Sequence, residues 1–248
     1  MDLPLHKTKI VCTIGPASAS PEVMGKMIQA GMNIARLNFS HGDFDSHRTV
    51  VRNLRSAARA AEKRVAIMAD LAGPKMRIGK LTQEPVELKS GDTFILTTDD
   101  IVGDSERASV TFKKLPQAVK PGDTLFLNDG IIQLDVSSAK GTEVVCRVIV
   151  GGELRSRKGL NLPGIDLGIS AFTERDHECL KFAAEEGIDA VSQSFVETGS
   201  DIRAVRKAAD LLGYHPFIIA KIERSNALDH MEDILDEADG IMIARGDL

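Results

Sequence analysis

Two apolar segments in the last third of the chain end in charged side chains. Residues 217–223 read Phe-Ile-Ile-Ala-Lys-Ile-Glu, and residues 240–248 read Gly-Ile-Met-Ile-Ala-Arg-Gly-Asp-Leu. Side chains two residues apart in a strand point to one face, so Lys221 and Glu223 are predicted to share a space. Ionisable groups at the exit of an apolar strand are typical of α/β sites, which collect at the carboxyl ends of the strands. Asp247 has the same position on the second segment.

Two earlier segments place polar side chains in the same way. Arg36, Asn38 and Ser40 recur with a period of two, and Asp70 ends the next apolar run. In a barrel these strand ends form one rim. The side chains predicted to converge there are two cations and three carboxylates, Arg36, Lys221, Asp70, Glu223 and Asp247. Such a set suits a hard metal ion that bridges an anionic substrate, which indicates phosphoryl or enolate chemistry.

The elements that would position these residues alternate between strand and helix. Apolar runs predict strands at 8–14, 33–39, 64–72, 190–195, 217–223 and 240–248. Helices are predicted from Ser20 to Gly31 and over 45–62, 173–187 and 200–212, with capping signals at Ser20-Pro21-Glu22 and Thr173 to Asp176. This alternation predicts parallel strands joined by right-handed crossovers.

The pattern changes between about Met76 and Gly164. Short alternating runs replace the helices there, and turn signals at 90–92, 121–123, 129–130 and 140–141 separate them. No convincing helix is predicted in this stretch. We therefore expect a small all-β insert, attached through two short connections near Gly73-Pro74 and Pro163-Gly164.

Composition excludes several classes of protein. The chain has 248 residues, of which 43% are hydrophobic and 27% charged, so it is long enough for a globular domain with an insert. A net charge of −5 argues against a nucleic-acid partner. Cys12, Cys146 and Cys179 form no CxxC pair and are expected to be small buried hydrophobes in a reduced compartment. Without a membrane-length apolar run or a signal-peptide pattern, the expected location is the cytoplasm.

Six motifs, in the family's order, resemble pyruvate kinase from about Thr8 to the last residue. They are MNIARLNFSHG at 32–42, ADLAGPKMR at 69–77, NDG at 128–130, KGLNLPG at 158–164, AKIE at 220–223 and ARGDL at 244–248. The resemblance implies an α/β fold, a (β/α)8 TIM-type barrel with an all-β lid domain inserted after the third strand, of which this chain holds six strands. It implies barrel segments at 1–73 and 165–248 and the lid at 74–164. The implied activity is phosphoryl transfer from phosphoenolpyruvate to ADP, giving pyruvate and ATP in glycolysis.

The resemblance also assigns roles by position. Lys221 matches the lysine that stabilises the transferring phosphoryl group and the developing enolate, and Arg36 matches a phosphate-contacting arginine. The resemblance thus assigns both residues to catalysis and to substrate binding. Glu223 and Asp247 match the ligands of Mg²⁺ or Mn²⁺, and Asp247 also belongs to the substrate site. Gly246 matches a position whose backbone N–H approaches the substrate. The positions that match nucleotide-phosphate contacts are Asn38, Ser40, His41, Arg77 and Lys158.

One departure from the family concerns potassium. Many members bind K⁺ through the positions that match Asn38, Ser40, Asp70 and the carbonyl of Leu71, and they carry a glutamate where this chain has Lys75. This chain resembles the K⁺-independent branch, in which the ammonium of Lys75 would take the place of the ion. K⁺ is therefore not expected to be required.

A second departure concerns length. The family's seventh and eighth barrel strands and its regulatory domain would follow Leu248. We therefore expect a fragment that is inactive or nearly so for the full reaction, or a gap that another chain closes, and a tetramer when full length. Two alternatives stay open. They are a metal-dependent aldolase acting on pyruvate, and a non-catalytic paralogue that binds phosphorylated ligands through a partner chain.

Overall fold

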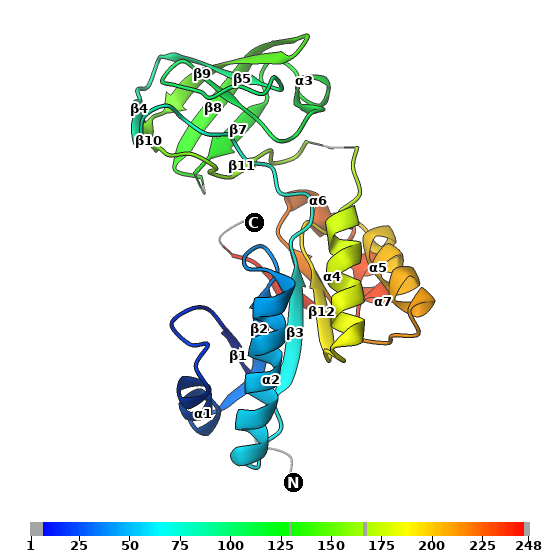
Figure 1. Ribbon diagram of the computed structural model, residues 1–248. Helices are drawn as coiled ribbons and strands as arrows, with labels where there is room; N and C mark the ends of the chain where they lie inside the picture. Colours follow the sequence, from blue (N-terminus) through cyan, green and yellow to red (C-terminus); the bar gives the residue numbers. More distant parts are fainter. Residues whose placement is uncertain (1–6, 129, 166–167, 246–248) are drawn as a thin grey trace. The chain divides into compact units, whose positions relative to one another are not determined.

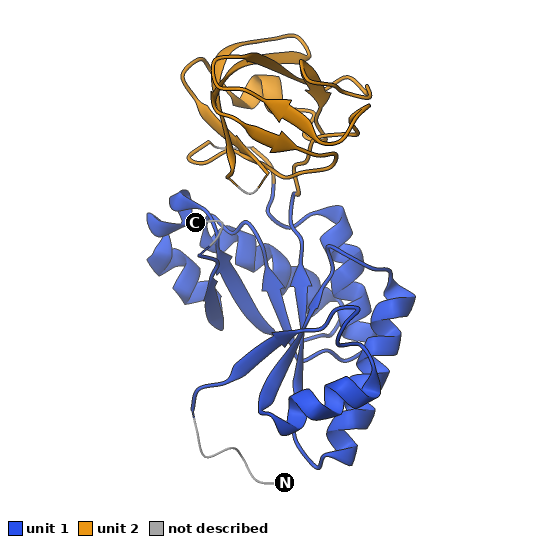
Figure 2. Cartoon of the chain, turned by 90° about the vertical axis from the view of Figure 1, so that its left-hand side faces the viewer, with its two compact units in different colours: residues 1–74, 170–246, 248 blue, residues 75–169, 247 orange. Residues whose placement is uncertain are grey.

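In a computed structural model, which describes residues 7–128, 130–165 and 168–245, the chain forms two compact units. The first unit joins the residues up to Pro74 to those from Ser170 onward, and the second consists of Lys75–Ile169 (Figure 2). The second unit is therefore inserted into the first, directly after the strand that carries Asp70.

The first unit is built on a sheet of six strands (Figure 1). The strands are β1 (Ile10–Thr13), β2 (Met32–Asn38), β3 (Ala66–Leu71), β12 (Ala190–Gln193), β13 (Phe217–Ile222) and β14 (Gly240–Ile243), and they lie side by side in this order. Each neighbouring pair is parallel. The predicted α/β class is confirmed, and all six predicted strands of this unit form.

Helices connect these strands, and several of them begin at a residue whose side chain caps the first turn. They are α1 (Pro21–Gln29), α2 (Phe44–Ala60), α4 (Glu174–Glu185), α5 (Gly199–Leu211), α6 (Ser225–Leu228) and α7 (Met231–Glu237). At α1 the hydroxyl of Ser20 accepts the N–H of Val23 at 3.3 Å, and at α2 the carboxylate of Asp43 accepts the N–H of Ser46 at 2.8 Å. Such side chains satisfy amide groups that have no partner within the helix.

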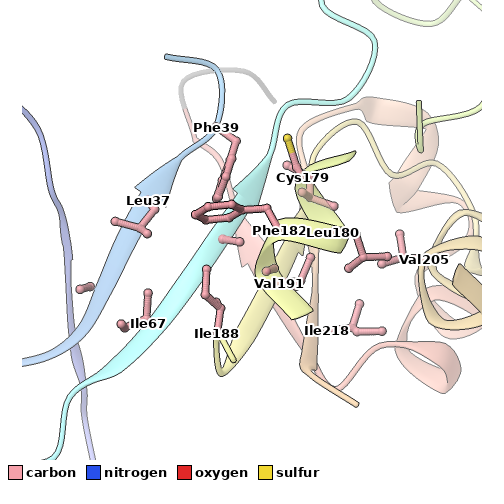
Figure 3. Packing of buried hydrophobic residues seen from close by; sticks show 14 of the residues in the cluster. Leu37, Phe39, Ile67, Cys179, Leu180, Phe182, Ile188, Val191, Val205 and Ile218 are labelled. Atoms are coloured by element: carbon pink, nitrogen blue, oxygen red, sulfur yellow. The ribbon is translucent and has the colours of Figure 1, made fainter. Parts of the chain in front are cut away.

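The core lies on one face of the sheet, where the strands pack against the helices (Figure 3). Leu37, Ile67, Val191 and Ile218 contribute from four strands, and Phe182 contributes from α4. Because successive side chains in a strand point to opposite faces, the residues between them face the other side. Those intervening residues include, toward the carboxyl ends of the strands, the polar or charged side chains Arg36, Asn38, Asp70, Ser192 and Lys221.

The second unit is almost entirely β. Its strands are β4 (Val86–Leu88), β5 (Thr93–Thr97), β6 (Arg107–Ser109), β7 (Thr124–Leu127), β8 (Ile132–Lys140), β9 (Glu143–Val150), β10 (Gly152–Leu154) and β11 (Leu160–Asn161). Most pairs are antiparallel, and the unit has its own apolar core. The expectation that this stretch has no helix was wrong in one place, since α3 spans Leu115–Ala118. Pro116 suits a first helical turn, and the fully buried Leu115 anchors it.

The three cysteines are free thiols, as expected from their spacing. Burial raises the pKa of Cys146 to about 12 and that of Cys179 to about 11, so both are neutral at ordinary pH. Cys12 is only partly buried. Within the described ranges, no helix combines the length and the hydropathy that crossing a membrane requires.

Asp176 provides a test of how α4 is held. Its Oδ2 accepts the Thr173 N–H at 2.9 Å and the Thr173 hydroxyl at 2.7 Å, and its Oδ1 accepts the N–H of Gly73 at 3.2 Å. Asp176→Ala removes a helix cap and leaves the buried N–H of Gly73 without its acceptor. The substitution should therefore lower the free energy of unfolding by about 2–3 kcal/mol in urea titrations. The comparison is Asp201, the cap of α5, whose Oδ2 accepts the partly buried N–H groups of Glu197 and Thr198 and has no contact like that of Asp176 with Gly73. Asp201→Ala should lower the free energy of unfolding by about 1 kcal/mol. Equal losses would contradict the role of the Gly73 contact.

Candidate active site

The side chain of Lys221 lies at the carboxyl end of β13 and is only 11% exposed. Its Nζ is 2.6 Å from Glu223 Oε1 and 3.5 Å from Asp70 Oδ1, and it donates to Ser194 Oγ at 2.8 Å. An ammonium taken from water needs such partners, because burying a charge alone is costly. Lys221 and Glu223 thus lie on one face, as the spacing of two residues predicts.

Asp70 connects Lys221 to Arg36. Its Oδ2 accepts Arg36 Nε at 2.7 Å and also accepts Nη2 of the same side chain. Its Oδ1 accepts the hydroxyl of Ser192 at 2.8 Å and faces Lys221. The remaining end of the guanidinium, Nη1, donates to Thr13 Oγ1 at 2.7 Å. The Asp70 carboxylate is therefore shared between two cations that come from different strands.

Glu223 is 6% exposed and uses both carboxylate oxygens. While Oε1 faces Lys221, Oε2 accepts the backbone N–H of Phe195 at 2.9 Å. Phe195 follows β12 and has a φ of +60°, a left-handed conformation that few residues other than glycine adopt. Next to this contact, the guanidinium of Arg224 pairs with Glu197. The loops after β12 and β13 are thus joined by two contacts.

Strand register explains why these residues meet. Asn38, Asp70 and Ser192 are register partners across β2, β3 and β12, so they form one row across the sheet. In β13 the partner of Ser192 is Ile219, and Lys221 stands two residues further along the same face. Parallel strands in register bring their carboxyl ends to one edge of the sheet, so residues far apart in sequence become neighbours.

The turn after β2 holds three predicted nucleotide-binding residues. Asn38 Oδ1 accepts the N–H of Ser40 at 3.0 Å, and the backbone oxygen of Asn38 accepts the N–H of His41 at 3.2 Å. The backbone oxygen of His41 contacts His47 Nε2 at 2.9 Å. The imidazole of His41 is exposed, and no hydrogen bond to it is present among the described residues. The turn is therefore shaped by Asn38 and leaves the His41 side chain open to solvent.

Four other predicted residues belong to the core of the first unit or to the second unit. The Leu71 side chain is fully buried in the core of the first unit. Lys75, Arg77 and Lys158 belong to the second unit. There Arg77 Nη1 donates to the oxygen of Arg157 at 2.9 Å, and the oxygen of Lys158 accepts the Ile78 N–H at 3.0 Å. The remaining two predicted residues, Gly246 and Asp247, lie outside the described residues.

Sequence reasoning did not single out several partners of these residues. Thr13, Ser192 and Ser194 each donate to or accept from a charged side chain of the site. A signal was present for the two serines, because they recur with a period of two at the end of an apolar strand. Thr13 carried no such signal, since its contact depends on the pairing of β1 with β2.

The charges of this group balance, with two cations, Arg36 and Lys221, against two carboxylates, Asp70 and Glu223. Such an arrangement can receive an anion by exchanging a carboxylate contact for a phosphate or carboxylate oxygen. Among the residues that the structure describes, no three His, Cys, Asp or Glu side chains converge as a metal site.

The shared carboxylate provides a prediction about stability. Asp70→Asn leaves Arg36 and Lys221 facing a single carboxylate, so the free energy of unfolding should fall by about 3 kcal/mol in urea titrations. The control is Glu22→Gln, which breaks the exposed Lys26–Glu22 pair and should change that energy by less than about 0.5 kcal/mol. Similar effects of the two substitutions would show that the buried network is not needed for stability.

Comparison of the sequence with known proteins identifies the family. The model of the pyruvate kinase barrel domain matches residues 5–248. The chain is 49% identical over its whole length to a pyruvate kinase of Thermococcus litoralis, of which it covers 52%. Over 98% of the chain it is 41% identical to pyruvate kinases of Corynebacterium glutamicum and Geobacillus stearothermophilus, of which it covers 51% and 42%. The chain thus spans about half the length of these relatives, and it belongs to the pyruvate kinase family.

Proposed function

We propose that the complete protein transfers a phosphoryl group from phosphoenolpyruvate to ADP, giving pyruvate and ATP. The observation that supports this most directly is the buried ammonium of Lys221, held between Glu223 and Asp70 at the carboxyl end of a parallel sheet. Membership of the pyruvate kinase family supports the same reaction. In this reaction the bond from phosphorus to the enol oxygen breaks and a bond from phosphorus to a terminal oxygen of ADP forms. The enolate that is released then takes up one proton at its methylene carbon and becomes pyruvate.

We propose that the six strands of the first unit are part of a (β/α)8 barrel and that the second unit is its lid. In this proposal 1–73 and 165–248 are barrel segments and 74–164 is the lid. The edge strands of the described sheet, β1 and β14, expose apolar side chains, among them Val11 and Ile243. Exposed apolar sheet edges invite pairing with further strands, which supports closure into a barrel.

Lys221 and Arg36 are the proposed catalytic residues, and Lys221 has the main role. As the phosphoryl group leaves, negative charge develops on the enolate oxygen and spreads over the phosphoryl oxygens. An ammonium fixed in a water-poor site stabilises that charge more strongly than water does. Its contacts with Glu223, Asp70 and Ser194 hold the ammonium in place before the substrate arrives. Lys221 would therefore act mainly on the rate of the chemical step.

The proposed phosphate-binding residues are those at the matching positions of the family's motifs. Arg36 would exchange part of its contact with Asp70 for a phosphate oxygen, since a guanidinium has five N–H donors in a planar fork. Gly246 and Asp247 would contribute to the substrate site. The proposed nucleotide-phosphate contacts are Asn38, Ser40, His41, Arg77 and Lys158.

Glu223 and Asp247 are the proposed ligands of Mg²⁺ or Mn²⁺. The Glu223 carboxylate fits this role, because each of its oxygens has one contact and a carboxylate offers about four lone-pair sites. When bound, the ion would supply positive charge to the substrate oxygens. Glu223 would orient that ion through an oxygen already held by the Phe195 N–H.

For monovalent ions we propose independence of K⁺. The positions that match the family's K⁺ ligands are Asn38, Ser40, Asp70 and the carbonyl of Leu71, and Lys75 would supply a positive charge in place of the ion. The pairing of Asp70 with both Arg36 and Lys221 supports this idea, since its carboxylate already has two cationic partners. We further propose a cytoplasmic location and a homotetramer for the full-length protein.

The assignment of Lys221 is tested by Lys221→Met in the complete polypeptide. Removal of a preorganised electrostatic donor should lower kcat by about 10²–10³-fold in a coupled assay of pyruvate formation. The control is Lys181→Met on the exposed surface of α4, which should retain kcat within about twofold. A Lys221→Met enzyme with nearly full turnover would exclude Lys221 from the reaction.

Dependence on K⁺ tests the assignment of Lys75. The unsubstituted enzyme should turn over equally well when K⁺ is replaced by a tetraalkylammonium ion. Lys75→Glu should make activity depend on added K⁺, because it replaces a positive charge by a negative one. Lys80→Glu, at an exposed lysine of the same unit, should stay independent of K⁺. Strong K⁺ activation of the unsubstituted enzyme would refute the proposal.

A further inference from the structure

The turn that follows β12 contacts both charges of the Lys221–Glu223 pair. Ser194 Oγ accepts Lys221 Nζ at 2.8 Å, and the Phe195 N–H donates to Glu223 Oε2 at 2.9 Å. With a φ of +60°, Phe195 has a backbone conformation that side chains disfavour. Such conformations persist only where surrounding contacts hold them, so this turn needs a restraint.

Gln193 restrains the turn through a hydrogen bond to its backbone. Its Nε2 donates to the backbone oxygen of Ser194 at 2.9 Å and to that of Ala171 at 2.7 Å, and the residue is fully buried. By strand alternation Gln193 shares a face with Val191, which packs in the core beneath the helices, whereas Ser192 contacts Asp70 on the other face. Gln193 therefore reaches the site only through the backbone of the turn.

The space around this turn is tight. A Cβ at Gly73 would lie 3.1 Å from the Ser194 oxygen, 3.3 Å from the Ala171 oxygen and 3.0 Å from the Phe195 ring. Gly73 is the last residue but one before the second unit begins, and Ala171 is the second residue after the chain returns to the first unit. The amide of Gln193 thus joins the returning connection to the turn that holds Lys221 and Glu223.

The oxygen of the Gln193 side-chain amide indicates that packing alone does not explain a glutamine at this position. Its Oε1 is buried and has no hydrogen-bond partner among the described residues. An unsatisfied buried acceptor is destabilising, and methionine would fill a similar volume without one. The two N–H donors are therefore the feature that distinguishes glutamine at this position.

We propose that Gln193 is a positioning residue. By binding the Ser194 and Ala171 carbonyls, it fixes the turn that aims the Ser194 hydroxyl at Lys221 and the Phe195 N–H at Glu223. This inference rests on the proposed function for its effect on turnover. Its effect on the turn does not depend on that function.

The test is Gln193→Met in the complete polypeptide, compared with Tyr214→Phe. Tyr214 donates one hydrogen bond of 2.6 Å to the Ile188 oxygen in the same unit, so its loss is a matched structural defect. Gln193→Met should lower kcat by about tenfold or more, with a smaller change in KM for phosphoenolpyruvate, because misplaced catalytic groups slow the chemical step. Hydrogen exchange at the Phe195 amide should become at least about tenfold faster. Tyr214→Phe should change neither quantity.

Loss of thermal stability in Gln193→Met, with kcat and Phe195 exchange like those of Tyr214→Phe, would overturn the proposal. Faster exchange with unchanged kcat would also overturn it, since the turn would then not matter for the reaction. If Gln193→Met does not fold, the test uses Gln193→Asn, which keeps the amide on a shorter side chain. This variant should show the same lower kcat and faster exchange at the Phe195 amide, each to a smaller degree. An unsubstituted protein without turnover would refute the proposed function, and exchange at Phe195 would still decide whether Gln193 holds the turn.

Discussion

The contact of the Lys221 ammonium with the carboxylates of Glu223 and Asp70 is the interaction on which the candidate site depends. Each of these three residues is buried, so none of them can rely on water to stabilise its charge. Arg36 completes the balance by pairing with Asp70. An incoming anion would therefore meet cations that are already held in position, and it would compete with carboxylates for them rather than with bulk solvent.

The two faces of the sheet carry different kinds of side chain. Leu37, Ile67 and Ile218 pack against helices on one face, and the charged network occupies the other. Because alternation in a strand allows no choice about which neighbour faces which side, the polar side chains have to lie together once the apolar ones are buried. Parallel register then brings them to one edge. The site is thus a consequence of how the first unit folds.

The turn at Ser194 and Phe195 links this network to the point where the chain returns from the second unit. The carbonyls of Ser194 and Ala171 share the amide of Gln193, and Gly73 lies close to both. The charged residues are therefore held by backbone groups as well as by one another. Backbone N–H groups and hydroxyls are suited to this task, since they orient a charge without adding one.

The sequence alone determined the α/β class, the six strands of the first unit and the side chains that interrupt them, because periodicity and capping are local properties. Lys221 and Glu223 could be paired from a spacing of two residues, and the motifs identified the family. Only the tertiary structure decided that Asp70 serves both Arg36 and Lys221, that Thr13 and Ser192 are partners, and that Gln193 holds the turn from the helix-covered face. Most of those contacts join residues that are far apart in the sequence, such as Thr13 and Arg36, which are 23 residues apart, and Asp70 and Ser192, which are 122 residues apart. The turn that Gln193 contacts contains Phe195, whose backbone is left-handed. Strand pairing and packing bring such groups together, and neither can be read from the residues on each side of a position.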